Sequence, residues 1–450
     1  MRGIQGKVTL LQQRSNVSRW RFDSAMNTKY FPMTTTLPEP QSVDFERPLG
    51  GLEHFFWLLD QHRPVHFAMA AHVEGHTEVS SWRTALDAAQ RRHPLLSVAI
   101  QAEAVQGPRF RTVADARVPL RIADAPPSRW RFEVAKELTA PFDAQRAPLV
   151  RAVLMQAQNE SVLIVVAHHS IADGLSVSYV VRDILQALQG EDLQPLDPLP
   201  AEEPLVYASQ AHGVTAEQAG QPESPQEGRS VSFRVLHGAL PAVEALSLPP
   251  DVTSKLIERA RKERTTVHGA LSAALVLAGR EISDDWACNP VRVLSPFNLR
   301  KQIGVDDDCG VFVWAAGVAM PTDWGTDFWE MARFAKSSLT TKQSIDRVAT
   351  EMHGVEQAIA SGIDVPTAAQ ILAQGFPCEL LLTNLGALQF DSCDLRPKAL
   401  WGPSVLMGFE GEQTVGVTTV NGSLCLLHTS FAPISGLLRR AELILRSACE

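Results

Sequence analysis

The apolar positions in the first part of the chain alternate between the spacing of helices and that of strands. Apolar residues three to four positions apart predict a helix over Val79–Arg92, and Pro94 ends it because proline cannot continue a helix. The same patterns predict strands over His66–Val73 and Leu95–Ala102 and a helix over Trp130–Leu138. This part of the chain therefore mixes helices and strands.

A strand-loop-helix unit follows. Two predicted strands, Leu149–Gln156 and Ser161–Ala167, are joined by a short turn and form a hairpin. The second strand is a continuous apolar run, SVLIVVA, which is typical of a central strand covered on both faces. A polar loop, HHSIADG, separates it from a predicted helix over Leu175–Leu188. We expect the chemistry of the protein to lie in this unit.

The C-terminal half shows a second set of helices and strands after a proline-rich segment. Residues 189–230 are rich in Pro, Glu, Gln and Ser and are predicted to be a linker or crossover. Strands are expected at Ser232–Leu236, Val291–Ser295, Val311–Val318, Glu379–Thr383, Thr414–Val420 and Leu424–Phe431. Helices are expected at Asp251–Glu263, Val267–Arg280 and Asp327–Ser338, with a last one from Ile434.

Composition narrows the class of protein. A chain of 450 residues is long enough for two large domains. Hydrophobic residues make up 45% and charged residues 20%, which excludes disorder as a general description. The net charge of −9 lacks the basic excess of a dedicated nucleic-acid-binding protein, so we expect no nucleic-acid partner.

The sequence also bears on location. No apolar run reaches the roughly 18 residues that a membrane helix needs, and no secretory signal is recognisable, so we expect a cytoplasmic protein. Residues 1–45 are expected to be a disordered leader, and the sequence leaves open whether residues 1–32 are native, because Met33 offers a second start. The six cysteines include no C-x-x-C pair and are expected to be free, buried thiols.

The loop HHSIADG carries the candidate chemistry. Either imidazole, His168 or His169, is suited to act as a general base near neutral pH. Asp173 cannot be assumed to face them, because the loop must turn sharply, and Gly174 is expected to supply the backbone freedom for that turn. Ser176 is a candidate cap for the following helix, whose N-terminal amides would face the same pocket.

Three other interpretations of this loop compete. A metal site would need a further distant ligand, and the usual H-x₃-H and H-E-x-x-H spacings are absent from the chain, so no metal is expected. The histidines could instead be hydrogen-bonded core residues with a structural role only. A Ser-His-Asp hydrolase is disfavoured, because no G-x-S-x-G elbow is found in the sequence.

HHSIADG resembles the H-H-x-x-x-D-G signature of the condensation-domain superfamily of acyltransferases. Further segments look like successive landmarks of that family, in the order RRHPLLSV (Arg91–Val98), PFDAQRAPLVRAVL (Pro141–Leu154), TTVHGALSAALVLA (Thr265–Ala278), SPFNLRKQIG (Ser295–Gly304) and LLTNLGAL (Leu381–Leu388). The resemblance covers roughly residues 48–435 and is closest to the stand-alone alcohol and polyketide-associated acyltransferases. The D-F-G-W-G motif of the plant branch is missing.

The resemblance implies an α+β fold with two chloramphenicol-acetyltransferase-like lobes, arranged as a V-shaped pseudo-dimer around a central tunnel. Residues 46–188 would form the N-terminal lobe with the signature, 189–230 the linker, and 231–450 the C-terminal lobe. Because both lobes would lie in one chain, a trimer of the chloramphenicol-acetyltransferase type is unnecessary and a monomer is expected.

The family pattern also assigns roles to individual residues. His169 matches the second His of the signature, the general base, and His168 the first, which more often shapes the loop. Asp173 matches a carboxylate that pairs with an Arg of the second lobe, and Arg300 stands at the matching position. Gly174 and Asn384 are expected to support the site.

The implied function is a free-standing acyltransferase of secondary metabolite or lipid biosynthesis. It would move an acyl group from a coenzyme A or carrier-protein thioester to an alcohol or amine, forming an ester or amide, with His169 as base. The thioester carrier would be a co-substrate, and no cofactor is expected. The alternative is a catalytically inactive condensation-like scaffold that binds a carrier protein.

Overall fold

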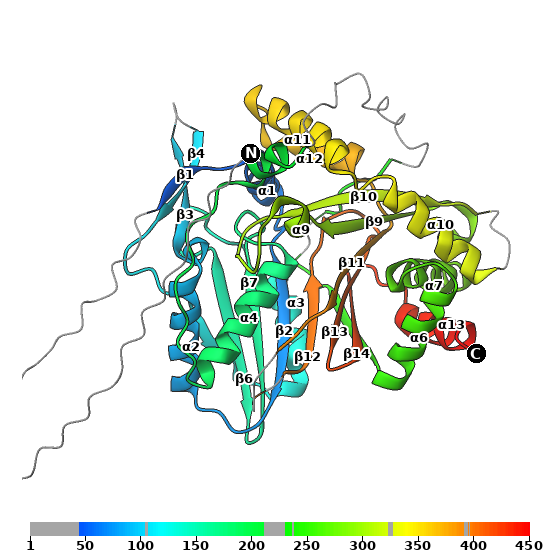
Figure 1. Ribbon diagram of the computed structural model, residues 1–450, viewed down its shortest axis with the longest axis horizontal. Coiled ribbons are helices and arrows are strands. Elements are labelled where there is room, and N and C mark those ends of the chain that lie inside the picture. The colour runs from blue at the N-terminus through cyan, green and yellow to red at the C-terminus, as the bar shows by residue number, and fades with distance from the viewer. Residues whose placement is uncertain are drawn as a thin grey trace, which may run out of the picture. The chain divides into compact units, whose positions relative to one another are not determined.

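A computed structural model describes residues 45–103, 107–210, 230–235, 238–322, 327–390, 395 and 397–450 (Figure 1). All of them belong to one unit, Ser42–Glu450. The expected leader, residues 1–45, lies outside the described residues except for Phe45, so that expectation stays a prediction.

A five-stranded sheet in the order β12-β2-β7-β6-β5 carries the signature loop. Its strands are β2 (Phe67–Glu74), β5 (Leu120–Ile122), β6 (Val150–Ala157), β7 (Glu160–Ala167) and β12 (Pro397–Ser404). The predicted hairpin is confirmed, because β6 and β7 pair antiparallel through a tight turn. β7 lies between β2 and β6, as its continuous apolar run predicted.

The helices of the N-terminal half are α1 (Gly51–His62), α2 (Val79–Arg92), α3 (Trp130–Thr139), α4 (Gly174–Leu188) and α5 (Glu202–Ala208), with short 3₁₀ turns at Pro94–Ser97 and Pro127–Arg129. Those that cover the faces of this sheet are α2, α3 and α4. Alternate residues of β2 pack on α2 and α4 or, on the other side, on α3 (Figure 1). The strand is therefore buried on both faces.

The second sheet has six strands in the order β10-β9-β11-β13-β14-β8. They are β8 (Ala242–Leu248), β9 (Val291–Asn298), β10 (Val313–Met320), β11 (Leu380–Ala387), β13 (Gln413–Val420) and β14 (Ser423–Ser430). The helices of this half are α6 (Pro250–Lys262), α7 (Val267–Ile282), α8 (Asp284–Cys288), α9 (Arg300–Ile303), α10 (Phe328–Thr340), α11 (Ile345–Ala360), α12 (Val365–Gly375) and α13 (Leu437–Ala448).

The two halves of the chain share a strand. β12 comes from the C-terminal half but pairs antiparallel with β2 in the N-terminal sheet. It is tied to the other sheet as well, because the Thr418 hydroxyl donates to the Leu400 carbonyl and the hydroxyls of Ser404 and Thr429 lie 2.6 Å apart. A division of the chain at residues 189–230 assigns this strand to the C-terminal lobe and does not predict its pairing with the N-terminal sheet.

Several sequence expectations differ from the structure in detail. The strand expected at Ser232–Leu236 is absent from its described part, residues 232–235, which form only an isolated bridge between Phe233 and Phe409. The structure also contains a three-stranded sheet of β1 (Glu46–Pro48), β4 (Gly107–Thr112) and β3 (Val98–Glu103). Of these strands the sequence predicted only β3, as part of Leu95–Ala102. The five described cysteines are free, but Cys288 is exposed and Cys449 half-buried; Cys393 lies outside the described residues.

Candidate active site

The signature loop leaves β7 and turns directly into α4. Asp173 is the N-cap of α4, and its carboxylate accepts a hydrogen bond from the Ser176 N–H at 2.8 Å. The expectation that Ser176 caps the helix is therefore wrong in its choice of residue. An aspartate at this position satisfies a backbone N–H group that has no partner inside the helix.

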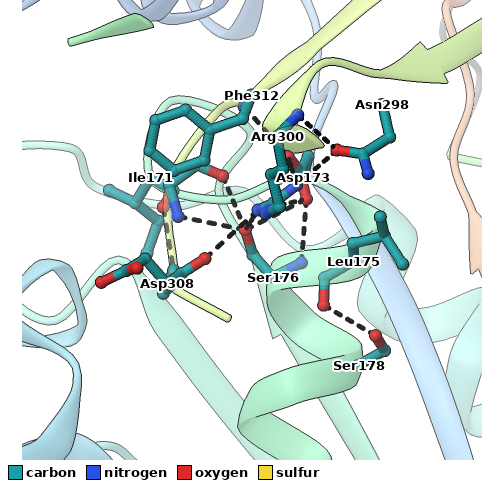
Figure 2. Close-up of polar contacts among 11 residues, drawn as sticks. Ile171, Asp173, Leu175, Ser176, Ser178, Asn298, Arg300, Asp308 and Phe312 are labelled. Atoms are coloured by element: carbon teal, nitrogen blue, oxygen red, sulfur yellow. Dashed lines mark hydrogen bonds and ion pairs between the residues drawn. The ribbon is translucent and has the colours of Figure 1, made fainter. Parts of the chain in front are cut away.

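Asp173 and Arg300 form a buried ion pair between the two halves of the chain (Figure 2). Arg300 is the first residue of α9, and its two terminal nitrogens lie 2.8 and 3.1 Å from the two carboxylate oxygens. Each residue is 3% exposed. Burial alone would raise the pKa of Asp173, but the charge and hydrogen bonds of Arg300 hold it below its usual value. The structure thus places together the two residues that the family pattern paired.

The Ser176 hydroxyl completes this buried cluster (Figure 2). It lies 3.0 Å from the Asp173 carboxylate and accepts from an Arg300 nitrogen at 2.8 Å. It also contacts both backbone groups of Gly310, donating to the carbonyl at 2.6 Å and accepting from the N–H at 3.0 Å. The Phe312 N–H donates to Asp173 at 3.0 Å. The carboxylate is therefore occupied by these partners and is not free to orient His169.

His169 lies beyond this cluster, at the wall of a cavity. The ring of Phe56 stacks on its imidazole with centroids 4.1 Å apart and planes only 6° from parallel, and Phe67 approaches it at 4.9 Å. Nδ1 is buried without a hydrogen-bond partner at normal geometry among the described residues. Burial lowers the pKa of His169 to about 4, only partly offset by its own backbone and by Asp173. The imidazole is therefore neutral at pH 7.

His168 faces the other way and is fully buried. Its Nδ1 accepts from the Ser170 N–H at 3.1 Å, and its Nε2 lies 3.3 Å from Asp60 on α1. Burial opposes ionisation of Asp60, but hydrogen bonds from His168 and His66 hold its pKa well below the usual range. These contacts lie inside the protein, away from the cavity, as expected for a residue that shapes the loop. No sequence pattern pointed to Asp60, because α1 was not predicted.

The cavity beside His169 has a volume of about 260 Å³ and mostly apolar walls. Its apolar lining comes from α1, α11, α12, β9 and the residues next to α12 and β10, and includes Phe55, Leu294, Phe312, Val355, Leu372 and Phe376. The polar side chains that reach it include His169, Asp173, Asn298, Arg300, Thr383 and Asn384. An apolar cavity with a few polar groups at one place is the usual form of a small-molecule site.

Gly174 and Asn384 both line this cavity, in different ways. The φ angle of Gly174 is not positive, so the expectation of special backbone freedom there is wrong. A Cβ at this position would instead lie 2.6 Å from Pro403 and 3.0 Å from Leu385, so glycine is needed for space. The Asn384 side-chain oxygen accepts from the Gly386 N–H at 2.9 Å and shapes the end of β11.

The landmark RRHPLLSV has a structural place away from the cavity. His93, fully buried, lies 2.8 Å from Asp183 on α4, and Arg92 donates to the same carboxylate oxygen at 2.7 Å. The contacts tie α2 to α4, the helix that Asp173 caps.

Among the described residues no group of three His, Cys, Asp or Glu side chains is arranged to hold a metal ion. None of the helices in that part of the chain is long and apolar enough to cross a membrane.

Two family models match the chain, one in each half. Residues 54–223 match the Condensation domain, and residues 237–390 match the Phthiocerol/phthiodiolone dimycocerosyl transferase C-terminus. Surfactin synthase subunit 2 of Bacillus subtilis (strain 168) is 26% identical over 314 residues, 65% of this chain and 8% of that protein. Malpinin synthetase of Mortierella alpina is 26% identical over 266 residues, 54% of this chain and 3% of that protein. The chain spans less than a tenth of the length of either relative.

Solved structures show the same fold over nearly the whole chain. The polyketide synthase associated protein 5 from Mycobacterium tuberculosis has a TM-score of 0.58 and 17% identity, covering 90% of this chain and 97% of that one. The first condensation domain of the CDA synthetase has a TM-score of 0.63 and 14% identity, covering 90% and 96%. The two family matches, the signature loop and these structures show that most of the chain is similar to condensation-type acyltransferases, with the α+β fold of two chloramphenicol-acetyltransferase-like lobes.

Proposed function

We propose that this chain transfers an acyl group from a thioester, carried by coenzyme A or by a carrier protein, to an alcohol or amine. The observation that supports it most directly is the position of His169, a neutral imidazole at the wall of an apolar cavity. The product is an ester or amide of secondary metabolite or lipid biosynthesis. The enzyme works as a cytoplasmic monomer with no metal or other cofactor.

The proposed step is a direct attack on the thioester. The acceptor oxygen or nitrogen forms a bond to the carbonyl carbon while His169 takes its proton, and the carbon–sulfur bond then breaks. The proton passes from His169 to the leaving thiolate, so the base is regenerated. A positioned base contributes about 10²–10⁴-fold, and the alignment of two bound substrates supplies much of the remainder.

The electrostatics of the loop support this role for His169. Its pKa of about 4 keeps it in the proton-accepting form throughout the neutral range. Asp173, paired with Arg300, raises the pKa of His169 but does not outweigh the effect of burial. The apolar walls suit the hydrocarbon part of an acyl group and limit water, which would otherwise hydrolyse a thioester.

The test measures thiol release from a panel of acyl-coenzyme A and acyl-carrier thioesters, with and without alcohol and amine acceptors. His169→Ala should lower kcat by about 10²-fold or more with normal folding. The acid limb of the wild-type pH profile should have its midpoint near pH 4, because only the neutral imidazole accepts a proton. His72 is a matched control, since burial also lowers the pKa of this histidine to about 4 but it does not line the cavity.

His72→Gln should leave the rate and the acid limb unchanged. Normal turnover in His169→Ala would contradict the mechanism. Binding of an acyl-carrier protein without any transfer by the wild type would favour the inactive scaffold instead.

A further inference from the structure

The base at position 169 lacks the partner that usually orients a catalytic histidine. Such an imidazole is commonly fixed by a hydrogen bond from its second nitrogen to a carboxylate or carbonyl. Here the nearby carboxylate, Asp173, is filled by Arg300, Ser176 and the Phe312 N–H. Nδ1 of His169 has no bond of normal geometry within the described residues, although its own backbone and that of Ala172 lie near enough to raise the pKa of this ring. A further contact is therefore a candidate for holding the plane of the ring.

Helix α1 contacts three consecutive residues of the signature loop. The Ser170 hydroxyl donates to the Glu53 carbonyl at 2.8 Å, Phe56 stacks on His169, and Asp60 lies 3.3 Å from His168. Positions 53, 56 and 60 are spaced by three and four residues, so they share one face of the helix. The loop thus runs along α1, with the aromatic contact between two polar ones.

Helix α1 is itself held firmly at its start. The Glu53 carboxylate accepts from both terminal nitrogens of Arg47 at 2.6 Å and from the Gly50 N–H at 2.7 Å. The Leu52 N–H donates to Glu203 of α5 at 2.9 Å. These bonds hold the start of α1 in place, so a side chain on this helix can hold a neighbouring ring in one orientation.

We propose that Phe56 is the positioning residue of His169: its ring lies flat against the imidazole and holds it in the orientation that turns Nε2 to the cavity. The inference rests on the proposed role of His169 as general base. The stacked ring covers a face of the imidazole and so fixes its plane without occupying the position where a nitrogen would meet a substrate. Because Nδ1 is the buried nitrogen, Nε2 is the one left to meet the acceptor.

The ring also influences the protonation of His169. Phe56 covers one face of the imidazole and excludes water from it, and burial is the main cause of the lowered pKa of His169. Asp173 and the backbone of His169 and Ala172 raise this pKa, and His168 lowers it. A change at position 56 replaces none of these groups, so a change in the titration of His169 would report the loss of the ring.

The first experiment is kinetic. Phe56→Leu and Phe56→Met keep an apolar side chain without a flat face, and Phe56→Tyr keeps the face. The first two should lower kcat by about tenfold or more with a smaller change in KM, and should move the acid limb from near pH 4 toward 6.5. Phe56→Tyr should retain both wild-type values. Trp57→Leu removes an aromatic ring from the same helix outside the cavity lining and should change neither.

A second experiment does not depend on activity. Histidine labelled at Cε1 allows the His169 resonance to be followed by NMR in the full chain, assigned by its loss in His169→Gln. In the wild type the stacked ring should shift the proton on Cε1 upfield, and the titration midpoint should be near 4. In Phe56→Leu the upfield shift should vanish and the midpoint should rise.

An unchanged resonance and midpoint in both Phe56→Leu and Phe56→Met would overturn the proposal, even if the enzyme is active. A changed resonance in a protein that transfers no acyl group would support the contact and contradict the proposed function instead.

Discussion

The ion pair between Asp173 and Arg300 gives the sharpest test of how the site is held. The Asp173 carboxylate accepts four hydrogen bonds: two from Arg300, one from the Ser176 N–H and one from the Phe312 N–H. Arg300→Ala removes two of them and leaves a buried carboxylate without its countercharge. Breaking a buried pair in this way costs about 3–5 kcal/mol, because the remaining charge is desolvated and uncompensated. Asp173→Asn should cost a similar amount by leaving the guanidinium unpaired.

The pair also predicts a pH dependence of stability. Because the folded-state pKa of Asp173 is below its unfolded value, the pair stabilises the fold above the unfolded pKa, and this contribution is lost as the pH falls through the folded pKa. In Arg300→Ala, burial is no longer offset by the guanidinium, so the pKa of Asp173 should rise. Protonation then removes the uncompensated buried charge, so the stability that Arg300→Ala loses relative to the wild type should shrink as the pH falls through this raised pKa.

The assay is urea unfolding followed by tryptophan fluorescence for the wild type, both single variants and the double variant. The double variant should cost less than the sum of the two single losses, by a coupling of about 0.5–3 kcal/mol. Lys398→Ala, which breaks an exposed pair with Glu74, should change stability little and serves as the control. Losses that add within about 0.5 kcal/mol would refute the reasoning, because contacting partners cannot be independent.

Three further outcomes are expected. Gly174→Ala should lower activity and destabilise the fold by about 1–3 kcal/mol, because the added methyl group contacts Pro403 and Leu385. Gly354→Ala, in open space on α11, should stabilise the fold slightly. Thermal melts compare the two variants, and an equal change in Tm would contradict the argument that position 174 lacks space for a Cβ. Ser176→Ala should cost about 1–3 kcal/mol, since Gly310 and Arg300 lose a buried partner, and an unchanged urea midpoint would show the hydroxyl to be dispensable. Transfer activity should survive exhaustive chelation, whereas loss that a divalent ion restores would support a metal site.

The sequence predicts best the elements whose burial pattern is simple. Helix α2 begins and ends at the predicted residues, because one apolar stripe faces the sheet and Pro94 follows it. The hairpin of β6 and β7 is predicted because its pairing is local. The pairing of β12 with β2 joins residues more than 300 positions apart in the chain, and no local pattern specifies such a partner.

The sequence located the signature loop but not what surrounds it. Helix α1 escaped prediction because it packs against α11, α12 and the loop at once, so its apolar residues follow no single stripe. The face toward the loop carries Glu53, Phe56 and Asp60, two charged residues and an aromatic one. Family resemblance supplied the contact between Asp173 and Arg300, but the stacked Phe56 and the carboxylate of Asp60 emerged only from the fold.

The signature loop is therefore positioned by three segments that are distant in sequence. Within helix α4, the Ser176 N–H donates to Asp173. Residues 300–312 supply the Arg300 guanidinium and the Phe312 N–H, which also donate to this carboxylate. Helix α1 contacts both histidines, through Phe56 and Asp60. The N-terminal half alone would keep the motif but would lack Arg300, the Phe312 N–H and strand β12. A buried carboxylate without those partners favours its protonated form or a different loop geometry. The geometry of the signature loop thus depends on both halves of the chain, even though all residues of the motif lie in one of them.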